Sequence, residues 1–183
     1  EPGATITNAI GGSGSLSYSG PGRLILEANN TYSGTTTISS GTLQIGNGDA
    51  TGSLGTGAIV NNASLVFNRS NTYTLGGGNT ISGSGTIEQI GSGTLDLAGI
   101  TSHSVGTWNL KNGSISNGTI SGDFTLESGS ISAVLGGSGN LTKNTGGTVT
   151  LTGNNTYAGI TTLNAGTLVV DGTHSGTSTV SVN

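Results

Sequence analysis

The sequence contains no cysteine and no methionine, and it has few charged or aromatic residues. Without cysteine, the chain can form no disulfide, no thiol nucleophile and no cysteine-ligated metal site. Lys and Arg together number four in 183 residues, too few to neutralise a run of nucleic-acid phosphates or to hold the chain on an anionic membrane. No apolar run approaches the roughly 20 residues of a membrane span. We therefore expect no nucleic-acid partner.

An initiator methionine and a signal peptide are also missing, because the chain opens with Glu1-Pro2-Gly3. Targeting segments of this kind are removed from mature proteins. We therefore expect the chain to be a mature or excised piece of a longer protein.

Glycine supplies 36 residues, and Thr, Ser and Asn are abundant between regularly spaced Leu, Ile and Val. Short segments that alternate apolar and polar residues predict β-strands, and the Asn-Gly dipeptides between them predict turns. The clearest strand segments are 24–26, 42–45, 64–67, 94–97, 148–151 and 167–170. No apolar pattern has a helical period, so we predict essentially no helix.

The sequence also repeats itself. Residues 11–46 align without a gap with residues 136–171, and 17 of the 36 aligned positions are identical. We place repeat copies near 11–48 and 136–173, with a partial copy at 81–99. The shared motif comprises Asn29, Asn30, Thr31, Tyr32, Gly34, Gly41, Thr42 and Leu43 in the first copy, and Gly137, Gly139, Leu141, Gly147, Leu151, Asn154, Asn155, Thr156, Tyr157, Gly159, Gly166, Thr167 and Leu168 in the last.

Two all-β folds suit short strands between glycine turns, namely a sandwich of hairpins and a solenoid. The repeats favour the solenoid, in which each strand pairs with the strand one coil earlier. At ~20 residues per coil and ~4.8 Å between coils, residues 1–183 would form a single parallel β-helix of about nine coils, about 40 Å long. Apolar side chains would form stacked columns inside, and Thr would face outward.

The stretch GGSGNLTKNTGGTVTLTGNNTYAGITTLNAGTLVV, residues 136–170, resembles the autotransporter-associated β-strand repeat, also called the passenger-associated-transport repeat. The resemblance includes the G-x-G-x-L-x-K run that ends at Lys143, the N-T-Y triplet at 155–157 and the final G-T-L. The first copy departs from the family pattern at Tyr18 and Arg23, where the family has Lys and Thr.

This resemblance implies a right-handed parallel β-helix within a bacterial autotransporter passenger, located at the cell surface or released from it. It also implies a C-terminal outer-membrane β-barrel in the parent chain and a structural role without catalytic residues or cofactors. We expect a stalk or display module that supports secretion. A long, nearly uncharged rod rich in Thr and Asn also suggests adhesion to a host-cell or matrix protein or glycan.

Few residues suggest chemistry. The glycine frames at Gly11 and Gly136 resemble the calcium-binding nonapeptide, but Leu16 and Leu141 stand where the ligand Asp is needed, so we expect no calcium site. A β-helix hydrolase would need clustered acids, for which the candidates are Asp96, Asp123 and Glu127, stacked on successive coils. We expect these to be single solvated residues and His103 and His174 to be exposed loop residues, which leaves no catalytic or metal site.

The aromatic residues allow two interpretations. Exposed Tyr32 and Tyr157 would form a face on which sugars stack, whereas buried rings would close the core at a corner, with each hydroxyl bonded to the backbone. We favour the buried position. Trp108, if exposed, is the best candidate for a binding hot spot, although burial is the expected state.

Three other functions remain open. A flat face of outward Thr, suggested by Thr35–Thr37 and Thr161–Thr162, could bind ice or a polysaccharide crystal. An uncapped coil at either end could associate end to end into a fibre. A carbohydrate-active β-helix enzyme would require the acids to gather on one face.

Overall fold

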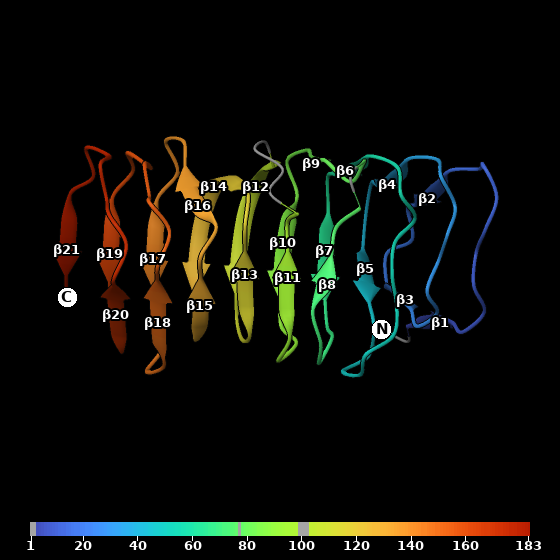
Figure 1. The fold of residues 1–183 in the computed structure, drawn as a ribbon, viewed down its shortest axis with the longest axis horizontal. Helices are drawn as coiled ribbons and strands as arrows, with labels where there is room; N and C mark the ends of the chain where they lie inside the picture. The colour runs from blue at the N-terminus through green and yellow to red at the C-terminus, as the bar shows by residue number, and fades with distance from the viewer. Residues whose placement is uncertain (1–2, 77, 99–102) are drawn as a thin grey trace.

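The computed structural model describes residues 3–76, 78–98 and 103–183. All regular structure in these residues is β-strand, and the strands form a straight rod along which the chain advances coil by coil, from the blue N-terminal coil on the right to the red C-terminal coil on the left (Figure 1). None of the described residues lies in a helix. The predicted all-β fold without helix is confirmed.

The strands form three sheets that run along the rod. The eleven-stranded sheet contains β1 (Ala4–Ile6), β3 (Arg23–Leu26), β5 (Thr42–Ile45), β7 (Ser64–Phe67), β10 (Thr86–Gln89), β12 (His103–Leu110), β14 (Thr119–Leu126), β17 (Leu141–Lys143), β19 (Thr161–Leu163) and β21 (Val180–Val182), with β16 (Val134–Gly136) paired to β14. The six-stranded sheet contains β8 (Tyr73–Thr74), β11 (Thr94–Asp96), β13 (Ser114–Ser116), β15 (Gly129–Ile131), β18 (Thr148–Leu151) and β20 (Thr167–Val170). The four-stranded sheet contains β2 (Leu16–Tyr18), β4 (Thr36–Ile38), β6 (Ile59–Asn61) and β9 (Ile81–Ser82).

Every pairing between these strands is parallel, and the paired residues lie between 15 and 23 positions apart in the sequence. Each strand therefore stacks on the strand one coil earlier, as a parallel β-solenoid requires. Nine steps join the ten strands along the path of the eleven-stranded sheet. The structure thus confirms the predicted solenoid of about nine coils.

The core consists of stacked columns of inward side chains. One column of the eleven-stranded sheet contains Leu24, Leu43, Leu65, Ile87, Trp108, Phe124 and Leu141 in register. From Leu43 onward these side chains are at most 1% exposed. Burying each large apolar side chain contributes roughly 1.5–3 kcal/mol, so the columns supply most of the stability along the rod.

The neighbouring inward column contains two polar residues, Gln89 and Lys143, each buried at the corner that leads to the six-stranded sheet. Gln89 Nε2 donates to the Gly91 and Gly93 carbonyls at 2.9 and 3.1 Å. Lys143 Nζ donates to the Thr145 carbonyl and lies 3.4 Å from the Ala165 carbonyl. Because a buried carbonyl without a donor is costly, these long side chains satisfy the turn carbonyls that the corner directs inward.

Two coils are shorter than the others. Trp108 and its partner Phe124 are 16 residues apart, and Phe124 and Leu141 are 17, whereas Leu65 and Ile87 are 22. The short coils contain the long strands β12 and β14, which pass from the face of the four-stranded sheet to that of the eleven-stranded sheet without a separate turn. An irregularity in the pairing between Ser104 and Thr107 marks this corner in β12.

Close stacking leaves no room for a side chain at several corner glycines, which yields a matched test. A Cβ added at Gly159 would lie 2.1 Å from the Gly139 carbonyl oxygen, whereas a Cβ at Gly146 meets nothing within 4 Å. We expect Gly159→Ala to lower the free energy of unfolding by about 1–3 kcal/mol, because the coils must move apart. Gly146→Ala should change it by less than ~0.5 kcal/mol. Urea unfolding of both variants checks this, and equal midpoints would contradict it.

Candidate functional site

The repeat motif forms the same corner in both copies. Along Asn-Asn-Thr-Tyr, the first Asn and the Thr are exposed and the second Asn and the Tyr are buried, at residues 29–32 and again at residues 154–157. The Tyr32 hydroxyl lies 2.6 Å from Thr36 Oγ1, and the Tyr157 hydroxyl lies 2.7 Å from Thr161 Oγ1. Both rings therefore belong to the core, but the hydroxyl partner is a threonine side chain and not the predicted backbone.

The buried asparagine connects this corner to the coil before it. Asn30 Oδ1 accepts a hydrogen bond from the Ile10 amide at 2.8 Å, and Asn155 Oδ1 accepts one from the Leu135 amide at 3.0 Å. In the first copy the amide nitrogen also donates to the Ser53 carbonyl of the coil after it, at 2.6 Å. The side chain of Asn30 thus bridges three coils.

The remaining motif residues occupy structural positions. Leu43, Leu141 and Leu151 are buried, and Leu168 packs against the core near the C-terminal end. Thr42 and Thr167 lie on the outer face of their strands, half-buried and exposed respectively. Gly34, Gly41, Gly139, Gly147 and Gly166 lie at corners where a Cβ would lie 1.9–2.7 Å from a carbonyl oxygen of an earlier coil, and Gly137 has a positive φ of 83°.

Trp108 lies in the core, with 1% of its surface exposed. Its indole Nε1 donates to the Ser121 carbonyl at 3.1 Å. The condition on which the hot-spot interpretation depended, an exposed indole, is therefore not met. The buried indole ring of Trp108 instead fills the interior at the first of the two short coils.

The expectation that His103 is an exposed loop residue is wrong. His103 begins strand β12, is buried, and packs edge-on against Trp108 with ring centroids 6.4 Å apart. Its Nδ1 accepts a hydrogen bond from the Ile81 backbone amide, with 3.1 Å between the two nitrogens. Burial disfavours the charged imidazolium and lowers the pKa of His103, an effect that the Leu97 carbonyl offsets in part. The adjoining residues Thr101 and Ser102 lie outside the described residues. His174 is exposed, as expected.

The acids that could have formed a catalytic pair lie on separate sheets. Asp96 belongs to β11 of the six-stranded sheet, whereas Asp123 belongs to β14 of the eleven-stranded sheet and Glu127 follows that strand. Burial opposes ionisation of the Asp96 carboxyl, but hydrogen bonds from Asn117, the Ala98 amide and Thr74 outweigh it and lower the pKa of Asp96. The possibility that the sequence left open, in which these three acids stack on successive coils, is therefore wrong.

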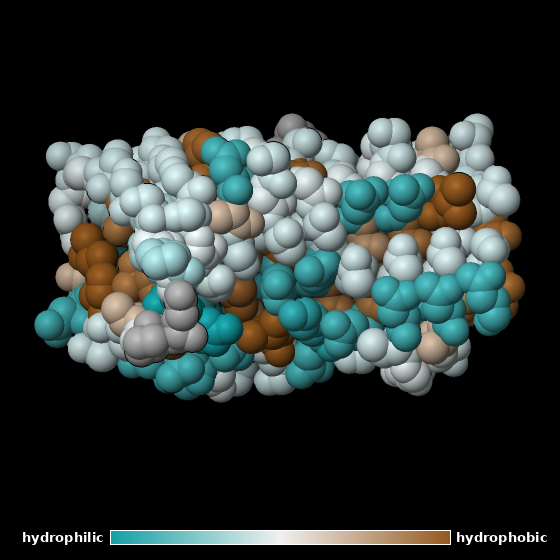
Figure 2. Space-filling model, turned by 180° about the vertical axis from the view of Figure 1, so that it is seen from behind, coloured by the Kyte–Doolittle hydropathy of each residue, from teal (hydrophilic) through white to brown (hydrophobic). Residues whose placement is uncertain are grey.

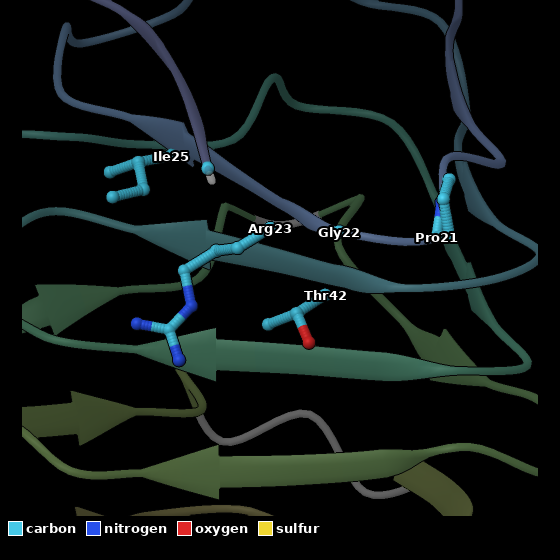
Figure 3. A pocket seen from close by; sticks show the side chains of 6 residues that line it. Pro21, Gly22, Arg23, Ile25 and Thr42 are labelled. Carbon is cyan, nitrogen blue, oxygen red and sulfur yellow. The ribbon is translucent and has the colours of Figure 1, made fainter. Parts of the chain in front are cut away.

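An open hollow of about 590 Å³ lies on the outer side of β3 and β5. Figure 3 shows Arg23 and Ile25 on strand β3, Pro21 and Gly22 in the segment that leads into it, and Thr42 on the adjacent strand β5. Arg23 is the one charged residue among those that line it. A single cation without a neighbouring acid or base in the lining provides no general acid–base pair.

In the described part of the chain, no group of three or more His, Asp and Glu side chains is placed to hold a metal ion. Among the same residues, no helix has the length and hydropathy needed to span a membrane.

The passenger-associated-transport-repeat family matches two segments, residues 16–45 and residues 141–170. The chain carries two passenger-associated-transport repeats. Each repeat begins at the first residue of a strand, β2 or β17, and ends at the last residue of another, β5 or β20. A repeat is therefore four strands, two from each of two successive coils. The partial copy at 81–99 stays a prediction.

A region of 85 residues also resembles the adhesin BmaC autotransporter of Brucella suis biovar 1 (strain 1330), with 42% identity. The aligned region is 44% of this chain and 2% of that relative, so the chain corresponds to a small part of its length. No solved structure matches the chain significantly. The repeats, the relative and the solenoid fold support a β-helical passenger segment, and the repeats and the relative indicate a surface-exposed or secreted location.

The two repeats lie on different faces of the rod, which sequence reasoning missed. In the first repeat the strands alternate between the four-stranded and eleven-stranded sheets, and in the second between the eleven-stranded and six-stranded sheets. Leu24 and Leu141 occupy one column six coils apart and are separated by 117 residues, eight fewer than the 125 between the repeats. The two short coils thus rotate the motif by about one face.

The Tyr–Thr hydrogen bond can be measured by a double-mutant cycle. We expect Tyr157→Phe and Thr161→Val each to be destabilising, with a coupling energy of about 1 kcal/mol, because each substitution removes the same buried bond. Denaturant unfolding of the single and double variants gives this value. As a matched control, Tyr157→Phe combined with Thr36→Val, the threonine of the other copy, should be additive. Equal coupling in both pairs would contradict the assignment.

The buried His103 makes stability depend on pH. Its pKa is lower in the folded chain than the ordinary value near 6.5, so its contribution is complete above about pH 6.5 and is lost as the pH falls through the folded pKa. Between pH 7.5 and 5, we expect the free energy of unfolding to fall by up to about 1.4 kcal/mol per pH unit. His103→Gln should flatten this slope, and His174→Gln should leave it unchanged. An unchanged slope in His103→Gln would overturn the assignment.

Proposed function

We propose that this chain is a non-enzymatic stalk and display segment of an autotransporter passenger and that its outer face contributes to adhesion. The observation that carries the proposal is an apolar core that continues from coil to coil through both transport repeats. Such a core stiffens the rod without disulfides, which suits a chain that passes through an outer membrane before folding. The separate placement of Asp96 and Asp123 favours a role without catalysis.

Coil-by-coil stacking also supports a role in secretion. Each coil pairs with the coils directly before and after it, so a segment that emerges outside the cell can add to coils that have already folded. Each added coil buries further apolar side chains, which favours outward movement over return. In the parent chain, the partner for this step would be a C-terminal outer-membrane β-barrel.

The outer face of the eleven-stranded sheet is the surface we propose for adhesion. Thr125, Thr142, Thr162 and Ser181 are stacked in register on four successive coils. Neighbouring strands lie roughly 4.8 Å apart, and each hydroxyl can both donate and accept a hydrogen bond. Such a column suits the polar groups of a host-cell glycan or matrix protein. The relative's name, an adhesin, supports the same role.

The flat threonine face considered for ice or crystal binding has less support. Thr36 and Thr161 face inward and bond to the buried tyrosines, so the two threonine runs do not present all their hydroxyls. Above Thr125 the outward column continues with Asn109 and Glu88, which interrupts the hydroxyls.

Adhesion is tested with beads that carry the purified chain and are applied to host cells. We expect binding above that of uncoated beads, and a loss of several-fold with Thr162→Glu, because a charge interrupts the hydroxyl column. Thr150→Glu, on the outer side of the six-stranded sheet, is the matched control and should bind normally. Glycosidase or protease treatment of the cells separates a glycan from a protein partner. Wild-type beads that bind no more than uncoated beads would refute adhesion.

A further inference from the structure

The two short coils leave a hollow at one corner of the rod. In other coils a separate turn joins the face of the four-stranded sheet to that of the eleven-stranded sheet, such as residues 83–85 between β9 and β10. In β12 and β14 the strand itself makes this bend, near Gly106 and Gly122, so both coils lack the residues of a turn. An open hollow of about 450 Å³, which we call the corner hollow, lies at this bend.

The corner hollow is lined by polar groups from three successive coils. Ser121 and Asp123, on either side of the bend in β14, both line it. Ser104 of the coil before and Ser138 of the coil after also line it. Ser104, Asp123 and Ser138 are exposed to solvent, and Ser121 is half-buried. Three hydroxyls and one carboxylate therefore surround a single space that solvent can enter.

The carboxylate of Asp123 is held in a fixed position at this hollow. Its Oδ1 accepts a hydrogen bond from the Asn140 backbone amide of the next coil at 2.8 Å. Its Oδ2 accepts no hydrogen bond from the described residues, so this oxygen is available to a ligand. Hydrogen bonds to an ionised carboxylate are roughly twice as strong as those between neutral groups. Asp123 therefore offers a ligand hydroxyl a strong acceptor whose place is already set.

Charge and size decide which ligand suits the corner hollow. Asp123 is the one charged residue among the described residues that line it, so a sulfated or sialylated glycan would bring negative charge beside a carboxylate. A calcium ion takes about six to eight oxygen ligands, more than one carboxylate and three hydroxyls supply. The volume lies in the range of small-molecule sites, roughly 300–1,000 Å³. An uncharged sugar, whose hydroxyls both donate and accept, suits this lining.

The corner hollow adjoins the surface proposed for adhesion. Asp123 and Thr125 are outward residues of β14 two positions apart, and Thr125 begins the column that continues with Thr142 and Thr162. Figure 2 shows one face of the rod with its C-terminal half on the right, where most of the surface is weakly polar or hydrophilic and hydrophobic patches are smaller. A glycan with one ring in the hollow can therefore continue along the hydroxyls of the sheet.

We propose that the corner hollow binds one sugar ring of an uncharged glycan and that the Asp123 carboxylate accepts a hydrogen bond from a hydroxyl of that ring. This inference rests on the proposed role in adhesion and names its ligand class, an uncharged glycan and not a matrix protein or an acidic glycan. The hydroxyls of Ser104, Ser121 and Ser138 serve further hydroxyls of the same ring. The two short coils, and not the repeat motif, create this site.

Binding to immobilised oligosaccharides tests the ligand class. We expect the purified chain to bind at least one uncharged oligosaccharide that ends in glucose, galactose or mannose, and to bind its sulfated or sialylated counterpart at least tenfold more weakly. Asp123→Asn retains an oxygen that accepts the Asn140 amide but removes the charge, so it should weaken binding by about fivefold or more. Glu127→Gln removes the same charge just after β14, outside the hollow, and should bind like wild type.

Three results of this measurement would overturn the proposal. They are a chain that binds none of the uncharged oligosaccharides, a chain that binds the acidic counterparts as well or better, and equal binding by Asp123→Asn and wild type.

A blocked hollow separates this site from adhesion as a whole. Ser138→Trp places a large ring in the corner hollow, whereas Ser130→Trp places the same ring on the outer side of the six-stranded sheet. Circular dichroism should show that both variants are folded. On beads applied to host cells, we expect Ser138→Trp to lower binding several-fold and Ser130→Trp to bind normally.

The outcomes of the bead experiment distinguish the two proposals. Beads that bind cells equally well with Ser138→Trp would refute the corner hollow as the site and leave adhesion standing. Cell binding that survives glycosidase treatment but is lost after protease treatment would indicate a protein partner and overturn the glycan. Wild-type beads that bind no cells would refute adhesion itself, and the oligosaccharide measurement would then decide whether the hollow binds a sugar.

Discussion

Backbone hydrogen bonds between equivalent strands of successive coils are the constraint on which the rest of the structure depends. They keep the coils in register at the spacing of a parallel sheet, so each side chain lies directly over its counterpart one coil earlier. Apolar residues at equivalent positions then form continuous columns, and each column excludes water from the hydrogen bonds beside it. The same spacing brings corner carbonyls so close that glycine is needed at positions such as Gly159.

Tight corners also create the main polar problem of this interior. A chain that turns in a few residues directs some carbonyls and amides inward, where water does not reach them. Lys143 and Gln89 donate hydrogen bonds to the turn carbonyls. Asn30 accepts a hydrogen bond from a backbone amide of the coil before it and donates one to a carbonyl of the coil after it. The polar residues of the repeat motif thus satisfy buried backbone groups that, in a larger core, hydrogen bonds within secondary structure alone would satisfy. This explains how the second Asn and the Tyr of the motif Asn-Asn-Thr-Tyr belong to the core and not to a binding surface.

The number of residues per coil decides which face of the rod carries each repeat. Where the corner turn between two faces is lost, as in β12 and β14, the coil becomes shorter and the motif moves to the next face. Small changes in coil length can therefore redirect the outward residues of a repeat while the inward columns continue unchanged. Such a rod can vary the surface that it presents without altering its core.

The sequence by itself determined the fold class, the approximate number of coils and the family of the repeats. The period of glycine turns and the alternation of Leu, Ile and Val are local properties that survive in the primary structure, and the gapless copies at 11–46 and 136–171 exclude chance. Only the tertiary structure decided which residues share a column. Trp108 and His103 lie outside the clear repeats, so their burial depends on contacts between coils. The hydroxyl partner of Tyr157, the separation of Asp96 from Asp123 and the rotation of the second repeat likewise depend on coil length. A count of residues between motifs cannot reveal where a corner turn has been lost, because that depends on how neighbouring coils pack.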